Sequence, residues 1–507
     1  MSISMLLDMA VGGDPVRTAL VSDDHRVTTA ELSDMAGRAA ESIAESGAGH
    51  VAYVGTGGII MPLLLFGAAR AGRAFTPLNY RLGAAALRDL IERLPAPLVV
   101  ADDAYAEVVR GAGHRIIDSA TFLATTRAAT TPGPAVDVDA APDQVAVVLF
   151  TSGTTARPKA VELTHANLTS YIMGTVDFGS AEAGDAALIC VPPYHVAGVG
   201  AALSNLYAGR TMVYLPHFDP HRWIRLVSQE KISNATVVPT MLDRIVTALA
   251  ENPEPLPSLR TLAYGGARAP LPLVRRALEL LPGVGLVNAY GLTETSSTIA
   301  VLTPEDHRAA YHATEPETAA RLGSVGRAIP GVELQIRDAA GAVVPAGETG
   351  ELYVRGDQVS GTYAETGSVL DADGWFPTKD LAALDADGYL YLGGRSDDTI
   401  IRGGENIAPA EIEDVLVEHP EVREAAVIGI PDPEWGQLLV AVVVPAPGQD
   451  PEPGELRGYV RTALRGSRTP DRIVFRNELP TTPTGKVLRR VLVDELTPVP
   501  SNSEELP

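Results

Sequence analysis

Apolar runs of strand length alternate with amphipathic segments of helical period as far as about residue 300, and this alternation leaves few folds open to the chain. The segment 28–47 begins with Thr28 and Glu31 at the spacing of a capping box, and its apolar residues then share one helical face. The run VAVVLF, which ends at Phe150, is typical of a buried strand in a parallel sheet. The sequence therefore predicts an α/β fold.

The pattern changes from about residue 323. Residues 332–338 (VELQIRD) alternate between polar and apolar, and GELYVRG follows them. Asp387 and Gly388 stand between two short apolar runs, as in a hairpin. We expect an antiparallel β subdomain here, within a large N-terminal region that spans residues 1–395.

Residues 396–496 are predicted to form a separate, small α+β domain. The patterns favour two helices and three strands, which are listed here in chain order: helix 409–419, strand 425–430, strand 438–444, helix 455–464 and strand 473–476. The tail 497–507 contains few core-forming residues and is expected to be disordered.

Charge and cysteine content exclude several classes of function. The 507 residues include 40 Lys and Arg against 63 Asp and Glu, so the net charge of −23 repels nucleic acid and anionic lipid. Cys190 is the single cysteine and cannot form an internal disulfide. The first residues lack the basic start of a secretory signal. The apolar stretch 51–69 contains four glycines and a proline, which favours a strand, a loop and a buried helix over a membrane span. We therefore expect a cytoplasmic protein.

The segment FTSGTTARPKAVELTH, residues 150–165, is the strongest local signal for chemistry. A predicted buried strand leads into five small residues that bear hydroxyl groups or no side chain: Thr151, Ser152, Gly153, Thr154 and Thr155. Arg157 and Lys159 follow, so the loop offers amide, hydroxyl and cationic donors together, as a polyphosphate requires.

Lysine is rare in this chain, which contains four lysines and 36 arginines. Lysine is a compact point charge on a thin stem and reaches places that a planar guanidinium does not fit. Two of the four, Lys159 and Lys486, lie in segments typical of phosphate sites, which marks both as candidates for function.

Residues 150–159 resemble the phosphate-loop signature of the adenylate-forming superfamily, which includes acyl-CoA synthetases, aryl-CoA ligases, peptide-synthetase adenylation domains and firefly luciferase. Further stretches are similar to motifs of this superfamily in the same order along the chain: 67–79, 288–295, 374–413 and 480–490. The resemblance implies an AMP-forming acid:CoA ligase that uses ATP, Mg²⁺ and CoA.

The resemblance implies that a carboxylate attacks the α-phosphorus of ATP and expels pyrophosphate, which needs no general base because the acid is already ionised at neutral pH. Lys486 and Glu294 are the implied catalytic residues, together with His195 in PPYHVAG. Lys486 would reach the α-phosphate and carboxylate oxygens, and Glu294 with Thr151 would hold Mg²⁺.

The same resemblance assigns nucleotide binding to residues spread over five segments. Lys159 and the small residues of the loop would bind phosphates, Tyr290 would stack on adenine, and Asp380 would accept both ribose hydroxyls. The full implied set is Thr151, Ser152, Gly153, Thr154, Thr155, Lys159, Gly265, Gly266, Ala267, Asn288, Ala289, Tyr290, Gly291, Thr293, Asp380, Arg395 and Lys486.

A second half-reaction would transfer the acyl group to CoA after the C-terminal domain rotates. Asp397 matches the hinge residue, and Gly403, Gly404 and Glu405 match the residues that contact CoA. Glycines at such positions leave room for pantetheine in a narrow channel.

The identity of the acid is left open. The implied acyl pocket contains His195, Gly266, Ser296 and Ser297, and His195 resembles the gate of fatty acyl-CoA synthetases. A medium- or long-chain fatty acid is our default, with an aryl or alicyclic acid as the alternative and an amino acid disfavoured. Transfer to a separate acyl carrier protein instead of CoA is a further alternative, and oligomer formation is left open.

Three positions depart from the superfamily pattern, since Ala156, Ala160 and Lys379 stand where glycine is usual. If the phosphate loop needs a positive φ at residue 156, the alanine there costs on the order of 1 kcal/mol and loosens phosphate binding. These departures are the only support for a third hypothesis, a nucleotide-binding regulator without catalysis.

Overall fold

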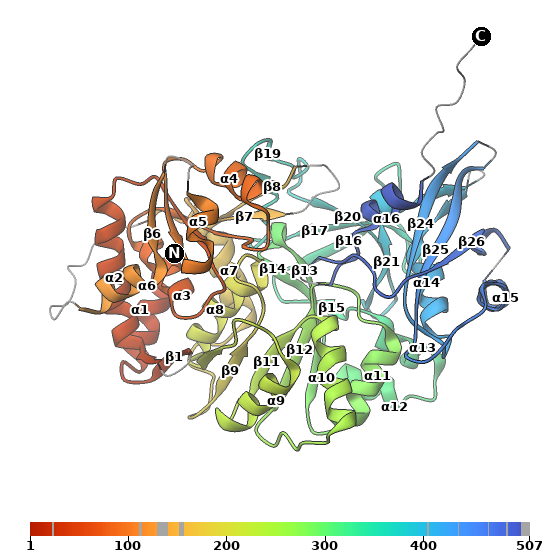
Figure 1. Ribbon diagram of the computed structural model, residues 1–507, viewed down its shortest axis with the longest axis horizontal. Helices are drawn as coiled ribbons and strands as arrows, with labels where there is room; N and C mark the ends of the chain where they lie inside the picture. The colour runs from red at the N-terminus through yellow and green to blue at the C-terminus, as the bar shows by residue number, and fades with distance from the viewer. Residues whose placement is uncertain are drawn as a thin grey trace, which may run out of the picture.

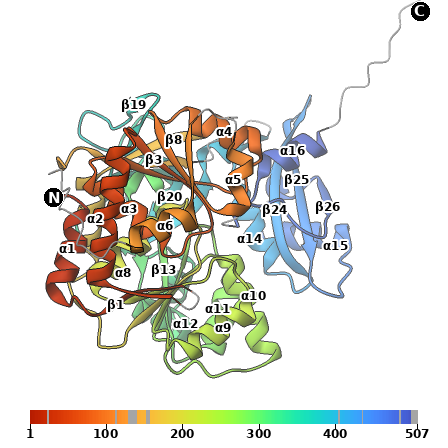
Figure 2. The same ribbon diagram turned by 60° about the vertical axis from the view of Figure 1, so that its left-hand side comes forward.

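The computed structural model describes the chain except residues 23–24, 111–113, 129–139, 152–156, 403–404, 434, 465, 483–484 and 498–507. Two large sheets with their helices form the main body, and the part that follows Arg395 lies to one side of it (Figure 1). The turned view in Figure 2 keeps this C-terminal part beside the main body. The mixed α/β class is thus as the sequence predicted.

The first sheet has nine strands in the order β15-β14-β13-β12-β11-β9-β10-β1-β2. Its central strands are parallel, whereas β13–β14–β15 and β1–β2 pair antiparallel at the two edges. The strands are β1 Thr18–Ser22, β2 His25–Thr28, β9 Ala186–Ile189, β10 Thr211–Tyr214, β11 Asn234–Val237, β12 Thr261–Gly265, β13 Gly285–Leu292, β14 Ser297–Leu302 and β15 Arg327–Ala328.

The second sheet has eight strands in the order β19-β18-β8-β7-β4-β3-β5-β6. Its strands are β3 His50–Val54, β4 Ala74–Leu78, β5 Pro97–Ala101, β6 Arg115–Asp118, β7 Val145–Thr151, β8 Lys159–Thr164, β18 Thr362–Tyr363 and β19 Gly367–Ser368. β7 pairs parallel with β4, as predicted for the run ending at Phe150, and antiparallel with β8. The strand β18 joins this sheet through Tyr363 and Val161, a pairing that the sequence did not predict.

The helices of the main body are α1 Ser4–Gly13, α2 Thr29–Glu45, α3 Ile60–Arg70, α4 Ala84–Glu92, α5 Asp103–Val109, α6 Ser119–Ala128, α7 His165–Thr175, α8 Val196–Ala208, α9 Pro220–Gln229, α10 Pro239–Glu251, α11 Leu271–Leu280, α12 Pro304–His312 and α13 Pro316–Ala320. The predicted capping box of α2 is present, with the Thr28 hydroxyl accepting from the Glu31 amide and the Glu31 carboxylate accepting from the Thr28 amide. The apolar stretch 51–69 forms β3 and the buried helix α3, as expected. Among the helices that the structure describes, none has the length and apolar character that crossing a bilayer requires.

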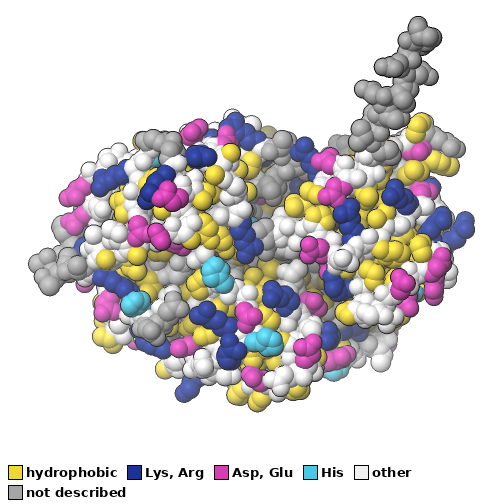
Figure 3. Space-filling view, viewed as in Figure 1, with side chains coloured by type: hydrophobic (Ala, Val, Ile, Leu, Met, Phe, Trp, Pro, Cys, Tyr) yellow, Lys and Arg dark blue, Asp and Glu magenta, His cyan; other side chains and the backbone are white. Residues whose placement is uncertain are grey.

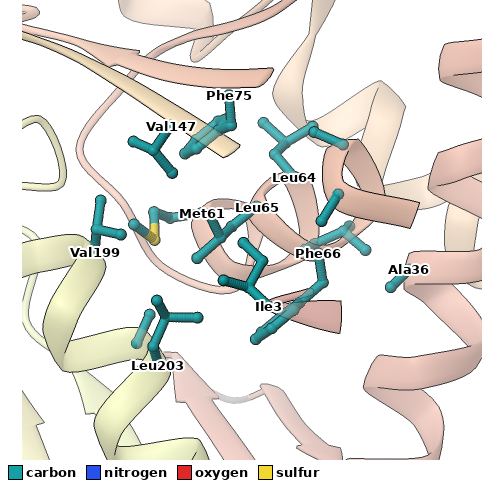
Figure 4. Close-up of a cluster of buried hydrophobic side chains, with 14 of the residues drawn as sticks. Ile3, Ala36, Met61, Leu64, Leu65, Phe66, Phe75, Val147, Val199 and Leu203 are labelled. Atoms are coloured by element: carbon teal, nitrogen blue, oxygen red, sulfur yellow. The ribbon is translucent and has the colours of Figure 1, made fainter. Parts of the chain in front are cut away.

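The largest core cluster joins the two sheets. It contains Phe75 and Val147 from the eight-stranded sheet and Leu20 and Met212 from the nine-stranded sheet. Figure 4 shows Met61 of α3 pointing toward Val199 of α8 within this cluster. Because these helices are fixed by burial between the sheets, the loops at their ends are rigidly placed.

A third sheet is antiparallel and has the order β16-β17-β20-β21. It contains β16 Glu333–Arg337, β17 Gly350–Arg355, β20 Phe376–Leu384 and β21 Leu390–Arg395. The predicted turn at Asp387 and Gly388 joins β20 to β21, and Gly388 has the positive φ of 81° that this turn requires. The antiparallel subdomain was therefore predicted correctly.

The C-terminal part contains a β22–β23 hairpin and a three-stranded sheet β24-β25-β26. Its elements are β22 Ile400–Arg402, β23 Glu405–Ile407, α14 Pro409–Val417, β24 Val422–Asp432, β25 Gly436–Pro445, α15 Pro453–Ala463, β26 Arg472–Phe475 and α16 Arg489–Leu496. The two helices and three strands predicted here are all present, and α16 is an addition that the sequence pattern did not reveal.

Candidate active site

The nucleotide end of the site forms where β12 and β13 run side by side. Gly265 pairs with Ala289 in register, and a Cβ on Gly265 would lie 2.2 Å from the Ala289 carbonyl oxygen. Gly266 has a φ of +79°, which turns the chain sharply after β12. The structure thus brings together the predicted residues Gly265, Gly266, Ala267, Asn288, Ala289 and Tyr290.

Asp380 on β20 lies buried beside this group. Its two carboxylate oxygens accept hydrogen bonds from the Tyr290 hydroxyl at 2.5 Å and from the Arg395 guanidinium at 3.1 Å. Burial raises the pKa of Asp380, while Arg395 and Tyr290 oppose the rise. A fixed carboxylate of this kind suits an acceptor of two ribose hydroxyls.

Lys486 in the C-terminal part faces the same cluster. Desolvation by the surrounding protein and the nearby charge of Arg395 lower the pKa of Lys486, whereas Asp398 and Asp380 oppose this shift. The lysine is therefore within electrostatic reach of the predicted ribose acid, although more than 100 residues separate the two along the chain, from 380 to 486. The predicted residues Lys486, Asp380, Arg395 and Tyr290 form one group.

A short turn presents Lys486. The Lys486 amide donates to the Thr482 hydroxyl at 3.0 Å, and the Thr482 amide donates to the Lys486 carbonyl at 2.7 Å. Gly485 has a φ of +81°, and a Cβ there would lie 2.9 Å from a methyl group of Thr240 in α10. The turn therefore rests directly on the main body.

A second group of charges surrounds Glu294 in the 3-10 helix η1 (Thr293–Thr295). The Glu294 carboxylate accepts from the Tyr363 hydroxyl at 2.8 Å, and the Lys159 ammonium lies 5.1 Å from the centre of the Tyr363 ring. Thr151 is the last residue of β7 and lies beside Lys159. The Thr151 hydroxyl donates to the Lys159 carbonyl, with the two oxygens 3.5 Å apart. The structure thus gathers Glu294, Thr151, Lys159 and the unpredicted Tyr363.

This second group fits a magnesium ion. Within the described residues, only one oxygen of the Glu294 carboxylate is hydrogen-bonded, so the other is available to a ligand. Mg²⁺ prefers carboxylate and hydroxyl oxygens and is usually completed by water and substrate phosphates. Glu294 and Thr151 would hold the ion, which would neutralise charge on the phosphates.

The turn that follows Glu294 is strained. Ser296 and Ser297 have φ angles of 58° and 127°, which non-glycine residues rarely adopt. The buried Gln358 amide stabilises the turn by donating to the carbonyls of Thr295 at 2.9 Å and Thr298 at 2.8 Å. The Ser296 hydroxyl is engaged within the protein, because it donates to the Gln358 carbonyl at 2.8 Å.

His195, a predicted acyl-pocket residue, is the N-cap residue of α8, but its side chain makes no capping hydrogen bond. Its ring contacts the Tyr194 ring in a tilted arrangement with centroids 4.5 Å apart, and its buried Nε2 has no hydrogen-bond partner within the described residues. Burial lowers the pKa of His195 to about 4, so the ring is neutral at pH 7. A neutral, half-buried ring can shape a pocket but cannot balance phosphate charge.

The predicted CoA residues are only partly visible. Glu405 in β23 lines a surface pocket of about 300 Å³ with Arg402, Trp435, Gly466 and Ser467. Several predicted residues lie outside the described part of the chain: Ser152, Gly153, Thr154, Thr155, Gly403 and Gly404. Ala156 also lies outside it, and Asp397 belongs to η3 (Ser396–Asp398), but its side chain is outside the description.

The two other departures from the superfamily pattern differ in their cost. Ala160 lies in β8 opposite Phe150 and is not among the described residues with positive φ, so it needs no glycine. Lys379 has a φ of +64°, the conformation that glycine would adopt without strain. The backbone is therefore strained at Lys379 and not at Ala160, whereas Ala156, at which strain was predicted, lies outside the described residues.

An ion pair links the nucleotide loop to the C-terminal part. This loop comprises residues 265–268, and its last residue, Arg268, pairs with Asp414 in α14. Sequence reasoning missed this pair, and it also missed Tyr363 and Gln358. Single polar residues in turn-rich segments carry no periodic signal, so only the folded structure reveals them.

Comparison with known proteins identifies the family. The sequence profile of the AMP-binding enzyme family matches residues 7–364, and that of the AMP-binding enzyme C-terminal domain matches residues 411–486. The chain belongs to the AMP-binding enzymes. It is an ATP-dependent ligase of the adenylate-forming superfamily, as its motifs predicted.

Several characterised AMP-binding enzymes are similar over almost their whole length. A feruloyl-CoA synthase from Amycolatopsis sp is 35% identical over 94% of this chain and 95% of its own. An indoleacetate–CoA ligase from Aromatoleum aromaticum is 32% identical over 96% of both chains. A fatty acid–[acyl-carrier-protein] ligase, ScoC from Streptomyces coeruleorubidus, is 32% identical over 95% of this chain and 94% of its own.

The fold is also that of solved AMP-binding enzymes. The crystal structure of ATP-bound MatB from Rhodopseudomonas palustris aligns with a TM-score of 0.85 and 28% identity, covering 98% of this chain and 99% of MatB. The predicted fold class is confirmed, and so are ATP and CoA as co-substrates used in this family, with Mg²⁺ as its usual metal.

Proposed function

We propose that this AMP-binding enzyme activates an aryl carboxylic acid as the acyl-adenylate and transfers the acyl group to CoA. The observation that carries the proposal is the position of Lys486, which lies within electrostatic reach of Asp380 and Arg395. A nucleotide whose ribose binds Asp380 would present its α-phosphate to this lysine. Such a cation stabilises the charge that develops when the carboxylate attacks phosphorus.

The predicted site residues fall into two groups, one that binds the nucleotide and metal and one that binds the acid. Tyr290 and Asp380 orient the nucleoside, and Lys159 with the hydroxyl of Thr151 binds the outer phosphates. Glu294 is held by the Tyr363 hydroxyl at 2.8 Å and would carry the metal. Lys486 bridges the α-phosphate and the attacking carboxylate, and His195 bounds the acyl pocket together with Gly266, Ser296 and Ser297.

The proposed two-step reaction requires two domains that move relative to each other. We infer a boundary at residues 395 and 396, with residues 396–496 moving as a unit about Asp397. In the conformation described above Lys486 faces the nucleotide site, whereas Glu405 lines a pocket that also contains Arg402 and Trp435. A rotation would withdraw Lys486 and bring Glu405, with Gly403 and Gly404, to the acyl-adenylate.

An aryl acid is preferred over the fatty acid that was our default from the sequence. The feruloyl-CoA synthase and the indoleacetate–CoA ligase act on aromatic acids by name, and the feruloyl-CoA synthase, at 35% identity, is more similar to this chain than the fatty-acid ligase at 32%. The alternative stated from the sequence is therefore better supported than the default. ScoC, at 32% identity, keeps a carrier protein as the second candidate acceptor.

Mass spectrometry of the reaction products tests the proposal. The purified protein is incubated with ATP, Mg²⁺ and a panel of aryl and fatty acids, with and without CoA. The proposal predicts aryl-CoA in the samples that contain CoA. Fatty acyl-CoA alone would contradict the aryl assignment, and acyl-AMP without thioester would favour the carrier protein.

A further inference from the structure

The acyl side of the site contains a polar pair that the reaction itself does not use. The Tyr171 hydroxyl in α7 donates to the Thr298 hydroxyl in β14, and the oxygens are 3.5 Å apart. This is the long limit of a hydrogen bond, so the pair is weakly satisfied. Each hydroxyl can donate one hydrogen bond and accept two, which leaves capacity for a third polar group.

Gly200 in α8 leaves room for about one methyl group beside this pair. A Cβ on Gly200 would lie 3.5 Å from Cε1 of Tyr171 and 3.8 Å from Oγ of Ser297. Three elements, α7, α8 and β14, therefore meet around a position where the chain provides no side chain. An aromatic ring is flat and can lie against such a backbone surface.

The position of the pair relative to the chemistry is fixed by the chain. Ser297 belongs to the strained turn after Glu294, at the proposed reacting end, and Thr298 directly follows that turn. Gly200 is five residues beyond His195 on α8, which corresponds to roughly 7 to 8 Å along the helix axis. An acid with its carboxylate at the reacting end would thus direct its far end toward Tyr171.

The ring of Tyr171 is held in place by apolar contacts. It packs against both the core cluster between the large sheets and the cluster that contains Ile299 and Phe376. Its hydroxyl is consequently presented from a fixed direction, as specific recognition of one ligand atom requires.

We propose that Tyr171 and Thr298 bind a hydroxyl group on the ring of an aryl carboxylic acid, at the end remote from the carboxylate. This inference rests on the proposed function and narrows its substrate class to hydroxylated aryl acids. An alkyl chain that reached this pair would displace water from the two hydroxyls without replacing the hydrogen bonds that the water made. The pair therefore disfavours the binding of fatty acids.

Replacing Tyr171 with Phe tests the proposal, because it removes the hydroxyl and keeps the ring. Two probes that differ by one group, 4-hydroxycinnamate and cinnamate, are compared by kcat/KM. The wild type should prefer the hydroxylated acid by about tenfold or more, and Y171F should lose about tenfold with 4-hydroxycinnamate only. The control is Tyr311→Phe, which removes a hydroxyl bonded to Glu279 outside the site and should change neither value.

Gly200→Ala gives a second measurement that does not depend on the hydroxyl. The added Cβ would make ordinary contacts at 3.5 Å and 3.8 Å, so the melting temperature should not fall. The kcat/KM of both aryl acids should fall, because the methyl group fills the space beside Tyr171.

The outcomes separate the two proposals. Equal losses with both acids in Y171F, or no preference in the wild type, would overturn the role of Tyr171 and Thr298 while leaving an aryl-CoA ligase intact. Failure of the wild type to adenylate either acid, with a fatty acid accepted, would overturn the proposed function and this inference together.

Discussion

Tyr363 contacts two charged side chains, Lys159 through its ring and Glu294 through its hydroxyl. Its ring faces the Lys159 ammonium at 5.1 Å, and its hydroxyl donates to the Glu294 carboxylate at 2.8 Å. The two charges that would meet the phosphates and the metal are therefore oriented by the same residue.

Tyr363→Phe separates these two contacts. The ring stays under Lys159, but the Glu294 carboxylate loses its orienting hydrogen bond. A hydrogen bond to a charged group contributes about 1.5 to 3 kcal/mol, so we expect a loss of about tenfold or more in the adenylation rate at limiting Mg²⁺. Pyrophosphate exchange measured against Mg²⁺ concentration checks this, and a rate equal to wild type at low Mg²⁺ would contradict it.

Charged residues in motifs could be predicted from the sequence, whereas their uncharged partners could not. The scarcity of lysine and the motif context marked Lys159 and Lys486, and the structure places Lys159 beside Tyr363 and Lys486 near Asp380 and Arg395. Tyr363 and Gln358 are single polar residues in a turn-rich segment, and their roles arise from contacts with Glu294 and residues 295–298. Such long-range contacts leave no trace in local pattern.

At the scale of elements, an ion pair between Arg268 and Asp414 joins the nucleotide loop to helix α14. Arg268 and Asp414 are each about half exposed, at 47% and 46% of the side chain. An exposed pair of this kind is worth up to about 1 kcal/mol. Because Arg268 is in the main body and Asp414 in the C-terminal part, this energy stabilises only the arrangement in which Lys486 faces the nucleotide.

Arg268→Ala should therefore slow adenylation by about two- to fivefold. Thioester formation from added acyl-AMP should be unchanged, because that step does not use this arrangement. Single-turnover measurements of each half-reaction check the expectation, with Arg268→Asp combined with Asp414→Arg as the variant that restores the pair. Equal slowing of both half-reactions would show that Arg268 acts on the fold instead.

Elements with regular patterns were predictable, and those defined by distant pairing were not. Helix α2, strand β7 and the β20–β21 hairpin follow from periodicity and turn residues. Strand β18 has two residues and pairs with β8 about 200 residues earlier, from Tyr363 to Val161. So short a strand exists only because its partner is already in place.

At the scale of the whole molecule, buried neutral histidines make the fold sensitive to acid. The His50 ring accepts or donates a hydrogen bond with the Thr76 hydroxyl at 2.7 Å, between β3 and β4. The His165 ring accepts from the Ile3 amide at 3.2 Å and so holds the N-terminus. Burial lowers the pKa of each to about 4, against 6.5 for an ordinary histidine.

Acidic and basic side chains are interspersed on the face in Figure 3.

The free energy of unfolding should fall as the pH decreases from 6.5 toward 4. In this range the unfolded chain takes up protons at these histidines and the folded chain does not, so each contributes about 1.4 kcal/mol per pH unit. His50→Gln keeps a partner for Thr76 without titrating and should reduce this slope. Urea unfolding at several pH values tests this, with the exposed His25→Gln as control, and an unchanged slope in H50Q would contradict it.

The central claim is that Lys486 performs adenylation from the position that it occupies beside Asp380 and Arg395. The most direct measurement compares both half-reactions in Lys486→Ala, with Lys231→Ala, in the turn after α9, as a control. We predict a loss of at least ~100-fold in acyl-AMP formation, while added acyl-AMP is still converted to thioester by a folded protein. Adenylation by K486A at near the wild-type rate would contradict the account.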